Sequence, residues 1–427
     1  TARNPVSTEI RGWDNYGRHS IVSPRRAGHH YHIRLAADGY VYAITNLRQP
    51  NYELSRASFG KLNEWIYYAT PPGTITDFEV FGDSVVLVIE DRLISKLYVL
   101  RPPNDLSLLS TSGQAETIRL SSNPGSSSKH VKIVRSGPHF LDQHEVIELA
   151  TGKREIIPRA SSQEPSLRQA WQEWYKSRDG TRVPFTWLAT SDTREPAPVL
   201  IIVYGAYGVP QNRGYRPQWS PLLERGLAIV QVHVRGGGEL GPTWHDAGRH
   251  HQKVNSINDL IDGVDYLIGS GRIDPERVFV RGVSAGAVTV AAAVNKRPEL
   301  FAGVILRAAY LDLIGSLADS TERLTPSDRL EWGNPAYQRD FDYLVSYSPY
   351  EQIRSQAYPP ILLTTSRLDT RVSMSESLRW LARLRAHDMG TGVKLLHIFD
   401  TGGHFGPSDQ YEIRKQDSLE YAFILTR

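Results

Sequence analysis

Short runs of alternating apolar and polar residues dominate the first 165 residues of the chain. Alternation with a period of two is typical of β-strands that bury one face. Turn-forming residues separate most of these runs, as in Ala37-Asp38-Gly39. We therefore predict an all-β segment, either a sandwich, a barrel or a propeller, with a long surface loop at 110–128 that is rich in Ser and Gly. The predicted strands are 31–35, 40–45, 65–69, 85–90, 97–100, 131–134 and 145–149.

The pattern changes near residue 185, where longer apolar runs begin to alternate with amphipathic segments of helical length. Continuous apolar runs are typical of strands in a parallel sheet that is buried on both faces. Strand–helix alternation along the rest of the chain predicts a doubly wound α/β domain with a mostly parallel sheet. The predicted strands are 199–204, 227–234, 278–282, 302–306, 361–365 and 393–399, and the predicted helices are 256–268, 285–294, 374–386 and 411–425.

Composition and charge restrict the possible partners. The chain has 427 residues, of which 40% are hydrophobic and 22% are charged, as is typical of a folded globular protein. Its formal net charge is only +3, so we expect neither nucleic acid nor a membrane as a partner. Cysteine is absent, which excludes disulfides, thiolate catalysis and Cys-ligated metals. This absence fits a reducing compartment, and we expect a cytoplasmic location.

The pentapeptide Gly282-Val283-Ser284-Ala285-Gly286 has the G-x-S-x-G spacing of a nucleophile elbow. It falls between a predicted strand and a predicted helix, which is the context that this motif requires. The glycines permit a sharp turn that presents the Ser284 hydroxyl above the sheet, and the Ala285 amide becomes an oxyanion donor at a helix N-terminus. We therefore predict that Ser284 is a catalytic nucleophile. The alternative is a tight turn that merely requires glycine.

An acid and a histidine follow Ser284 in the chain order of an α/β-hydrolase triad. Asp369 and His404 each follow a predicted strand, so both stand at the carboxyl ends of parallel strands, where the active sites of such sheets lie. We predict that Asp369 orients the imidazole of His404, which takes the proton of Ser284. The alternatives are a helix N-cap for Asp369, an ordinary loop position for His404, and Asp400 as the rival acid.

Glycine-rich turns and a group of histidines complete the candidate chemistry. Tyr204 precedes a Gly-containing turn, so its hydroxyl is a candidate second oxyanion donor, the alternative being a packed aromatic at a strand end. The triple glycine at 236–238 fits neither a P-loop nor a dinucleotide-binding motif, and we expect no cofactor. His245, His250 and His251 lack H-E-x-x-H spacing, so we expect a solvated loop there and no metal site.

Seven motifs occur together in the second part of the chain: SRDGTRVP at 177–184, YGAYG at 204–208, VRGGGE at 234–239, GVSAG at 282–286, EWGNP at 331–335, YSPY at 347–350 and GGH at 402–404. In combination they resemble the prolyl oligopeptidase family of serine peptidases, and most closely its oligopeptidase B branch. The resemblance covers roughly residues 171–425. It implies an α/β-hydrolase domain joined to a seven-bladed β-propeller, which admits peptides to the active site and spares folded proteins.

The resemblance also implies roles for individual residues. Arg371 corresponds to the arginine with which prolyl oligopeptidases hold the substrate backbone, and Val372 follows it as in those enzymes. The residues that correspond to the triad and the oxyanion hole of the family are Ser284, Asp369, His404, Tyr204 and Ala285.

In oligopeptidase B, an acidic stretch just before Trp-Gly-Asn-Pro binds the P1 Arg or Lys of the substrate. Asp328 corresponds to one of the paired carboxylates, Leu330 replaces the other, and Glu331 lies close by. A guanidinium is bound best by two acceptors. The resemblance therefore implies a preference for basic P1 residues, and we expect it to be shallower than a pocket with two carboxylates would give.

The segment before the hydrolase domain is too short for a whole seven-bladed propeller. At about 40–50 residues per blade, 165 residues correspond to three to four blades. We therefore expect a partial β-propeller at 1–165, with its N-terminal blades missing, and an α/β-hydrolase catalytic domain at 166–427. An open half-ring exposes sheet edges and apolar faces, so an upstream segment or another chain is expected to complete it.

The function predicted from these observations is that of a serine oligopeptidase, which hydrolyses short peptides through an acyl-enzyme. The expected partner is thus a short peptide substrate. One alternative is a relative that uses the same triad to transfer an acyl group to an amine, or to hydrolyse a small ester or amide. Another is a non-catalytic scaffold built on a hydrolase fold. The intact triad argues against this alternative, because a scaffold does not need one.

Overall fold

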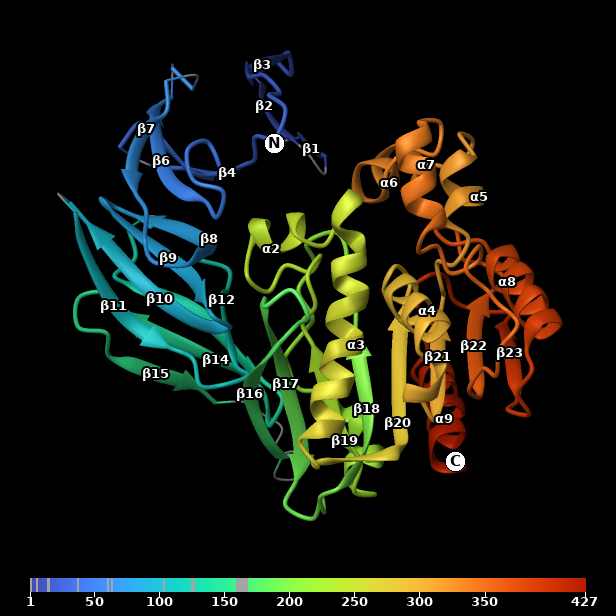
Figure 1. Cartoon of the computed structure of the whole chain (residues 1–427). Helices are drawn as coiled ribbons and strands as arrows, with labels where there is room; N and C mark the ends of the chain where they lie inside the picture. Colours follow the sequence, from blue (N-terminus) through green and yellow to red (C-terminus); the bar gives the residue numbers. More distant parts are fainter. Residues whose placement is uncertain are drawn as a thin grey trace. The chain divides into compact units, whose positions relative to one another are not determined.

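The chain folds into two compact units, which are traced in Figure 1. The structure is a computed structural model that describes residues 2–4, 7–13, 16–36, 38–59, 61–62, 64–102, 104–123, 127–158 and 168–427. The first unit comprises Thr1–Pro165, Asn212–Tyr215 and Leu240–Thr243, and the second comprises Ser166–Gln211, Arg216–Glu239 and Trp244–Arg427. The boundary predicted between residues 165 and 166 lies outside the described residues.

The first unit is built from antiparallel sheets whose strands follow one another in chain order. The first sheet has three strands, and the next three have four strands each, which is the architecture of propeller blades. The predicted partial propeller of three to four blades is therefore confirmed. The strands are β1 (Ala2–Asn4), β2 (Ser7–Trp13) and β3 (His19–Ser23); β4 (Tyr31–Leu35), β5 (Tyr40–Thr45), β6 (Glu53–Ser58) and β7 (Ile66–Ala69); β8 (Thr74–Phe81), β9 (Ser84–Asp91), β10 (Ile94–Arg101) and β11 (Asp105–Thr111); and β12 (Thr117–Leu120), β13 (His130–Gly137), β14 (Phe140–Glu148) and β15 (Arg154–Ile157).

Strand β9 shows how the blades share their apolar cores. Successive side chains of a strand point to opposite faces. Leu87 packs in a buried cluster with residues of the β4–β7 blade, including Leu54. Its neighbour Val88 packs in a second cluster with residues of the β12–β15 blade, including Ile133. Each such side chain contributes about 1.5–3 kcal/mol by its burial, so the β8–β11 blade is stabilised from both of its faces.

The long surface loop predicted at 110–128 is wrong, because β12 runs through it and β11 ends within it. Ile118 is the one residue of β12 that is fully buried, and it packs against the cluster that contains Val88. A four-residue strand with a single buried side chain leaves too little alternation to be recognised among the surrounding Ser and Gly residues.

The second unit is built on an eight-stranded sheet with the order β16-β17-β19-β18-β20-β21-β22-β23. The last six strands of this order are parallel, and β17 pairs antiparallel with both of its neighbours. The predicted doubly wound fold is therefore confirmed, although β16 and β17 were not among the predicted strands. The strands are β16 (Arg168–Lys176), β17 (Arg182–Thr190), β18 (Ala197–Val203), β19 (Ala228–Val232), β20 (Ile273–Val283), β21 (Gly303–Arg307), β22 (Ile361–Ser366) and β23 (Lys394–Phe399).

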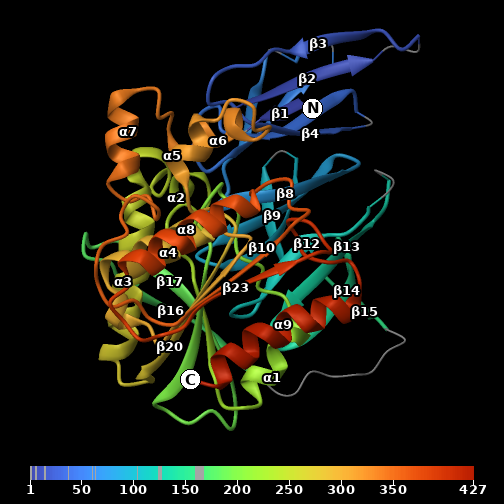
Figure 2. The same cartoon turned by 90° about the vertical axis from the view of Figure 1, so that its right-hand side faces the viewer.

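Helices cover both faces of this sheet, as Figure 2 shows from the β23 edge. α3 and α4 lie on one face, whereas α1 and α9 lie on the other, where Leu222 and Phe423 pack in one cluster with Ile229 and Ile305 of the sheet. Among the described residues, no helix has the length and apolar character needed to cross a membrane. The helices are α1 (Ser220–Leu223), α2 (Pro242–Asp246), α3 (Lys253–Gly269), α4 (Gly286–Lys296), α5 (Leu313–Ala318), α6 (Thr325–Trp332), α7 (Gln338–Val345), α8 (Met374–His387) and α9 (Gln410–Leu425), with 3-10 turns η1 (Pro217–Trp219), η2 (His250–Gln252) and η3 (Pro298–Leu300).

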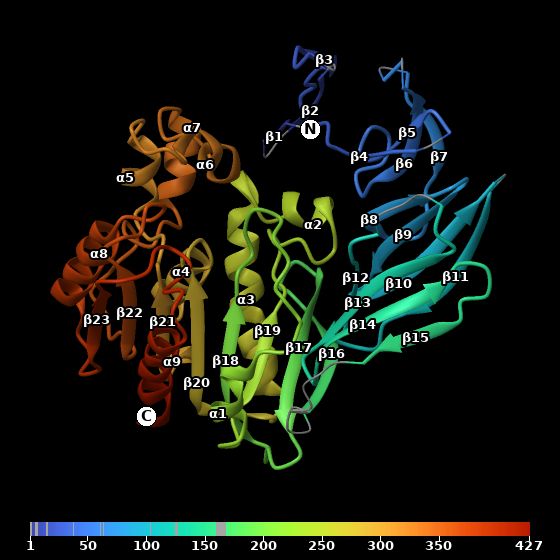
Figure 3. The ribbon, with the colours of Figure 1, turned by 180° about the vertical axis from the view of Figure 1, so that it is seen from behind.

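The topology of the sheet brings the candidate residues to one edge. The neighbouring strands β18, β20, β21, β22 and β23 run parallel, so their carboxyl ends lie along the same side of the sheet (Figure 3). Tyr204 follows β18, Ser284 follows β20, and Asp369 and His404 lie in the loops after β22 and β23. Segments far apart in the sequence therefore meet where the crevice of an α/β sheet lies.

Candidate active site

Ser284 lies on a tight turn between β20 and α4. Its backbone is left-handed, with φ of 55°, a conformation that is rare for residues other than glycine and clusters at functional sites. Two hydrogen bonds hold the turn: the Ser284 amide donates to the carbonyl of Arg307 over 2.9 Å, and the Ser284 carbonyl accepts from the amide of Tyr310 over 3.2 Å. The strand-to-helix turn thus presents the hydroxyl at the carboxyl edge of the sheet.

The two glycines of the elbow are explained by close backbone contacts. A Cβ on Gly282 would lie 2.8 Å from the carbonyl oxygen of Gly286, and a Cβ on Gly286 would lie 2.8 Å from the carbonyl oxygen of Val203. Real Cβ atoms essentially never approach backbone oxygen so closely. The G-x-S-x-G pattern is therefore required by the packing of α4 against β18 and β20.

His404 lies between Ser284 and Asp369. The His404 Nδ1 atom is 2.8 Å from Asp369 Oδ2, and the Nε2 atom is 2.9 Å from Ser284 Oγ. An ionised carboxylate only accepts hydrogen bonds, so Nδ1 carries the proton and Nε2 is left to accept from the serine hydroxyl. This arrangement is that of a nucleophile, a general base and a carboxylate that orients the base.

The Asp369 carboxylate is held by the loop that carries it. Its side chain is fully buried, and its Oδ1 atom accepts the backbone amides of Arg371 (2.8 Å) and Val372 (3.0 Å). Burial alone would raise the pKa of Asp369, but the hydrogen bond from His404 and these two amides outweigh burial, and the pKa lies below its usual value. Asp369 therefore stays ionised beside the imidazole at neutral pH.

Asp400, the rival acid, lies in a different environment. Its side chain is 78% exposed, and its Oδ1 atom is 3.1 Å from Nε of Arg367, which is also exposed. A carboxylate in water whose partner is a surface guanidinium is poorly placed to stabilise a buried imidazolium. The geometry therefore favours Asp369 over Asp400 as the partner of His404.

Tyr204 and Ala285 lie together beside the elbow. Ala285 is the N-cap of α4, so its amide is among the N–H groups that have no acceptor inside the helix. The Tyr204 side chain packs against the same turn, since a Cβ on Gly286 would lie 3.2 Å from Cδ2 of Tyr204. Burial, with the nearby negative charge of Glu331, raises the pKa of Tyr204 to about 12, so its hydroxyl keeps a proton to donate.

We predict that Tyr204→Phe lowers kcat about 10²- to 10³-fold and changes KM little, because the hydroxyl would donate to an oxyanion that exists only in the transition state. Steady-state kinetics on a peptide substrate measure both constants. A loss confined to KM would show that Tyr204 only forms a wall of the substrate pocket.

Helix α6 carries two carboxylates with different surroundings. Glu331 is buried: its Oε1 atom accepts the amide of Tyr207 over 2.8 Å, and its Oε2 atom is 2.7 Å from Nε2 of His245. Asp328 is half-buried and accepts the hydroxyl of Tyr207 over 2.9 Å. Burial, followed by the like charge of Glu331, raises the pKa of Asp328 above its usual value despite the hydrogen bond from Tyr207. Both oxygens of Glu331 are thus occupied by the chain itself, whereas Asp328 retains one oxygen without a hydrogen bond from Tyr207.

Arg371 and Val372, the other predicted substrate-binding residues, differ in exposure. Val372 is buried, whereas Arg371 is exposed and its guanidinium lies 4.7 Å from the ring centroid of Phe405. Phe405 is 83% exposed, and its ring meets the imidazole of His404 edge-on at 5.4 Å. Arg371 is therefore the one of the pair that can reach a substrate, with an aromatic ring on one side of it.

Sequence reasoning missed a buried lysine behind the site. Lys253 is fully buried at the start of α3, where its Nζ donates to the carbonyls of Gly205 and Gly248 and lies 4.7 Å from the ring centroid of Trp332. Burial lowers its pKa to about 8. The signal was present in the sequence, because Lys253 falls on the apolar stripe of α3, four residues before Ile257. The roles of Tyr207, His245 and Phe405 left no comparable signal.

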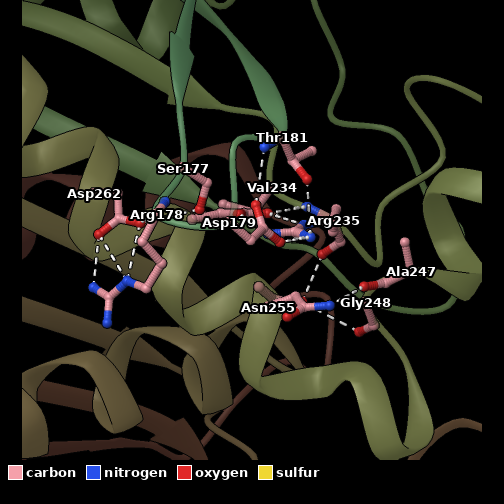
Figure 4. A network of polar contacts seen from close by, with 12 residues as sticks. Ser177, Arg178, Asp179, Thr181, Val234, Arg235, Ala247, Gly248, Asn255 and Asp262 are labelled. Atoms are coloured by element: carbon pink, nitrogen blue, oxygen red, sulfur yellow. Dashed lines mark hydrogen bonds and ion pairs between the residues drawn. The ribbon is translucent and has the colours of Figure 1, made fainter.

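A buried ion pair between Arg235 and Asp259 holds the loop after β19 beside the turn that follows Tyr204. Arg235 donates to both carboxylate oxygens of Asp259, at 2.6 and 2.9 Å. It also donates to Asp179 at 2.5 Å, and Figure 4 labels these two residues. Gly236 follows with φ of 93°, and a Cβ there would lie 2.4 Å from the carbonyl oxygen of Gly205. This close approach explains the glycine and fixes the turn after Tyr204.

The solvated loop predicted for the three histidines is only partly correct, because the three residues lie in α2 and η2 and their side chains are partly buried. His245 contacts buried Glu331, as described above, and its side chain is only 19% exposed. His250 and His251 both approach the carboxylate of Asp340 on α7. These contacts join residues about 90 positions apart, which the local sequence pattern does not reveal.

An α/β-hydrolase sheet accompanied by four-stranded antiparallel blades defines the class of the protein: the α/β-hydrolases that carry a β-propeller. The chain belongs to the prolyl oligopeptidase family, whose family model matches residues 214–427. The resemblance noted from the sequence motifs is thereby confirmed.

Curated relatives match over nearly the whole chain. Protease 2 of Moraxella lacunata is 28% identical over 414 residues, which are 95% of this chain and 60% of the relative. Dipeptidyl aminopeptidase BI of Pseudoxanthomonas mexicana is 27% identical over 441 aligned residues, which cover 100% of this chain and 60% of the relative. The chain thus spans about 60% of the length of these relatives.

Solved structures match in the same way. Oligopeptidase B from Leishmania major has a TM-score of 0.93 at 22% identity, over 99% of this chain and 62% of the other. Oligopeptidase B from Trypanosoma brucei, solved with covalently bound antipain, has a TM-score of 0.92 at 25% identity, over 99% of this chain and 63% of the other. The likeness to the Leishmania major structure shows the fold of this chain. The Trypanosoma brucei structure has the same fold and holds a covalently bound inhibitor.

Proposed function

We propose that this chain is a serine oligopeptidase that hydrolyses short peptides. The observation that carries the proposal is the position of His404, whose two nitrogens lie 2.8 Å from Asp369 and 2.9 Å from Ser284. Membership of the prolyl oligopeptidase family and the likeness to oligopeptidase B support it. We also propose that the second unit is the catalytic domain and that the first is a partial propeller.

The proposed reaction proceeds through an acyl-enzyme. His404 Nε2 takes the proton of the Ser284 hydroxyl as Oγ attacks the substrate carbonyl, and the Tyr204 hydroxyl and Ala285 amide donate to the oxyanion. The intermediate collapses as the C–N bond breaks, and His404 gives its proton to the leaving amine. Water then attacks the ester with His404 again as base, which releases the acid and restores Ser284.

The proposal is tested by labelling and product analysis. A fluorophosphonate probe should label Ser284, as peptide mapping by mass spectrometry would show. Incubation with a mixed library of short peptides should then yield free acids and amines. Products joined to an added amine would indicate an acyl transferase, and an unlabelled, inert chain would indicate a scaffold.

For specificity, we propose that Asp328 binds the P1 side chain and that Glu331 positions the pocket. Both oxygens of Glu331 have partners within the chain, Tyr207 and His245, while Asp328 holds only the Tyr207 hydroxyl. A lone carboxylate fits a basic side chain less selectively than a pair does.

We predict that Arg and Lys are preferred at P1, and that Asp328→Asn reduces the preference for Arg over Phe about 10- to 150-fold, the equivalent of one charge-assisted hydrogen bond. Asparagine keeps an acceptor for the Tyr207 hydroxyl, so the pocket should retain its shape. The measurement is kcat/KM on matched substrates with Arg, Lys, Pro, Phe and Ala at P1. An unchanged Arg/Phe ratio in the variant, or a parent that prefers Pro to Arg, would contradict this assignment.

A further inference from the structure

His250, His251 and Asp340 form a compact cluster outside the candidate active site. The two histidines belong to η2, and the aspartate lies in the first turn of α7. His251 Nε2 lies 2.8 Å from Asp340 Oδ1, and His250 Nε2 lies 3.7 Å from Asp340 Oδ2. One ligand-type atom from each residue can be chosen so that all three lie within 4.8 Å of one another. The side chains are 37%, 22% and 12% exposed in the order given, so the cluster is sheltered and still reachable from solvent.

The backbone and neighbouring groups orient these side chains toward one another. His250 has a left-handed backbone, with φ of 49°, and this conformation places two consecutive imidazoles beside the same carboxylate, with ring centroids 4.4 Å apart. Asp340 Oδ2 also accepts the amide of Asn334 over 2.8 Å, and the ring of His251 packs edge-on against Tyr343 at 5.2 Å. Supporting contacts of this kind orient the ligands of metal sites.

Two imidazoles and one carboxylate are a ligand set suited to zinc and similar divalent transition metals. With bonds of about 2.0–2.2 Å, the ligand atoms of a tetrahedral zinc site lie roughly 3.3–3.5 Å apart. One ligand atom from each of the three residues lies within 4.8 Å of the others, so the side chains need to move by about an ångström to reach the spacing of a bound ion. Water can occupy the remaining position, because the cluster is open to solvent.

We propose that His250, His251 and Asp340 bind a divalent transition-metal cation, with Zn²⁺ as the best-fitting ion, which fastens η2 to α7. This assignment replaces the sequence expectation of no metal site. The segment that η2 belongs to also carries His245, bonded to Glu331, and Arg249, which donates to the carbonyl of Leu330 over 3.2 Å. The ion would therefore stabilise the segment that contacts Glu331 and Leu330 of α6, and it would not contact Ser284.

The test is a Zn²⁺ titration of the metal-free chain in competition with a chromophoric zinc chelator. We expect one ion per chain, and binding weakened about tenfold or more in His250→Asn, His251→Gln and Asp340→Asn, since even outer-shell changes cost 10- to 100-fold. His130→Ala, which removes an exposed imidazole of β13, is the matched control and should bind as the parent does. Equal binding in parent, control and all three variants, or no stoichiometric binding by the parent, would overturn the proposal.

A second measurement separates lost ligands from lost folding. Asparagine tolerates the left-handed backbone of residue 250, and glutamine at 251 can still donate to Asp340, so these variants should keep the melting temperature of the metal-free parent. Added Zn²⁺ should raise the melting temperature of the parent and of His130→Ala but not of His250→Asn. Co²⁺ should give the visible absorption bands of tetrahedral coordination in the parent and not in His250→Asn. Bands of equal intensity in His250→Asn would count against the site.

Discussion

Ser284→Ala should reduce peptide hydrolysis by on the order of 10⁴-fold or more while the fold stays intact. The substitution removes only the hydroxyl that would attack the substrate carbonyl, whose oxygen lies 2.9 Å from His404 Nε2. Alanine has the same Cβ as serine, so the left-handed turn and its hydrogen bonds to Arg307 and Tyr310 are retained. The measurement is kcat/KM on a cleaved peptide, beside circular dichroism and thermal melting of parent and variant.

Labelling with the fluorophosphonate probe supplies an independent readout of the same substitution. The parent should become labelled and Ser284→Ala should not. Full peptidase activity in a clean Ser284→Ala preparation would show that another nucleophile operates. Loss of both activity and thermal stability would instead indicate that the elbow had unfolded, and Ser284→Gly, which relieves the left-handed backbone, then replaces it as the test.

Asp369→Asn should lower kcat about 10⁴-fold, because the amide can donate to Nδ1 and thereby favours the wrong tautomer of His404. The hydrogen bonds from the amides of Arg371 and Val372 end on Oδ1 and can be kept by the asparagine oxygen. The geometry of the loop should therefore survive while the general base is lost. Kinetics on the substrate used for Ser284→Ala measure the effect.

Asp400→Asn is the matched control, since it makes the same chemical change at the other acid near His404. Asp400 is exposed and pairs with Arg367 rather than with His404, so its replacement should leave kcat within about twofold of the parent, and its stability within about 1 kcal/mol. If Asp400→Asn were the inactive variant and Asp369→Asn the active one, the triad assignment would have to be reversed.

The sequence was most informative where local pattern and function coincide. Continuous apolar runs identified the parallel strands, and the spacing of Gly282, Ser284 and Gly286 identified the elbow because each glycine is required by a close backbone contact. Asp369 and His404 could be placed because each follows a strand of the sheet, and the topology then determines that they meet. No side chain from outside these loops is needed to locate them.

Contacts over long sequence distances were not predictable in this way. The two partners of the Glu331 side chain come from residue 207 and residue 245, and the sequence around Glu331 does not indicate either of them. His251 and Asp340 are separated by 89 positions, and nothing in either segment alone indicates the other. The edge strand β16 and its neighbour β17 were also missed, since their antiparallel pairing departs from the strand–helix alternation on which the prediction rested.

The alternating side chains of β9 have a consequence for how the first unit holds together. Leu87 belongs to one interface between blades and Val88 to another, so the β8–β11 blade takes part in two nearest-neighbour couplings. The stability of such an array is approximately a sum of blade terms and interface terms, as in a one-dimensional chain of coupled sites. Loss of this blade would remove its own contribution to the free energy of unfolding and those of two interfaces. The blades on either side of it would then unfold independently of each other.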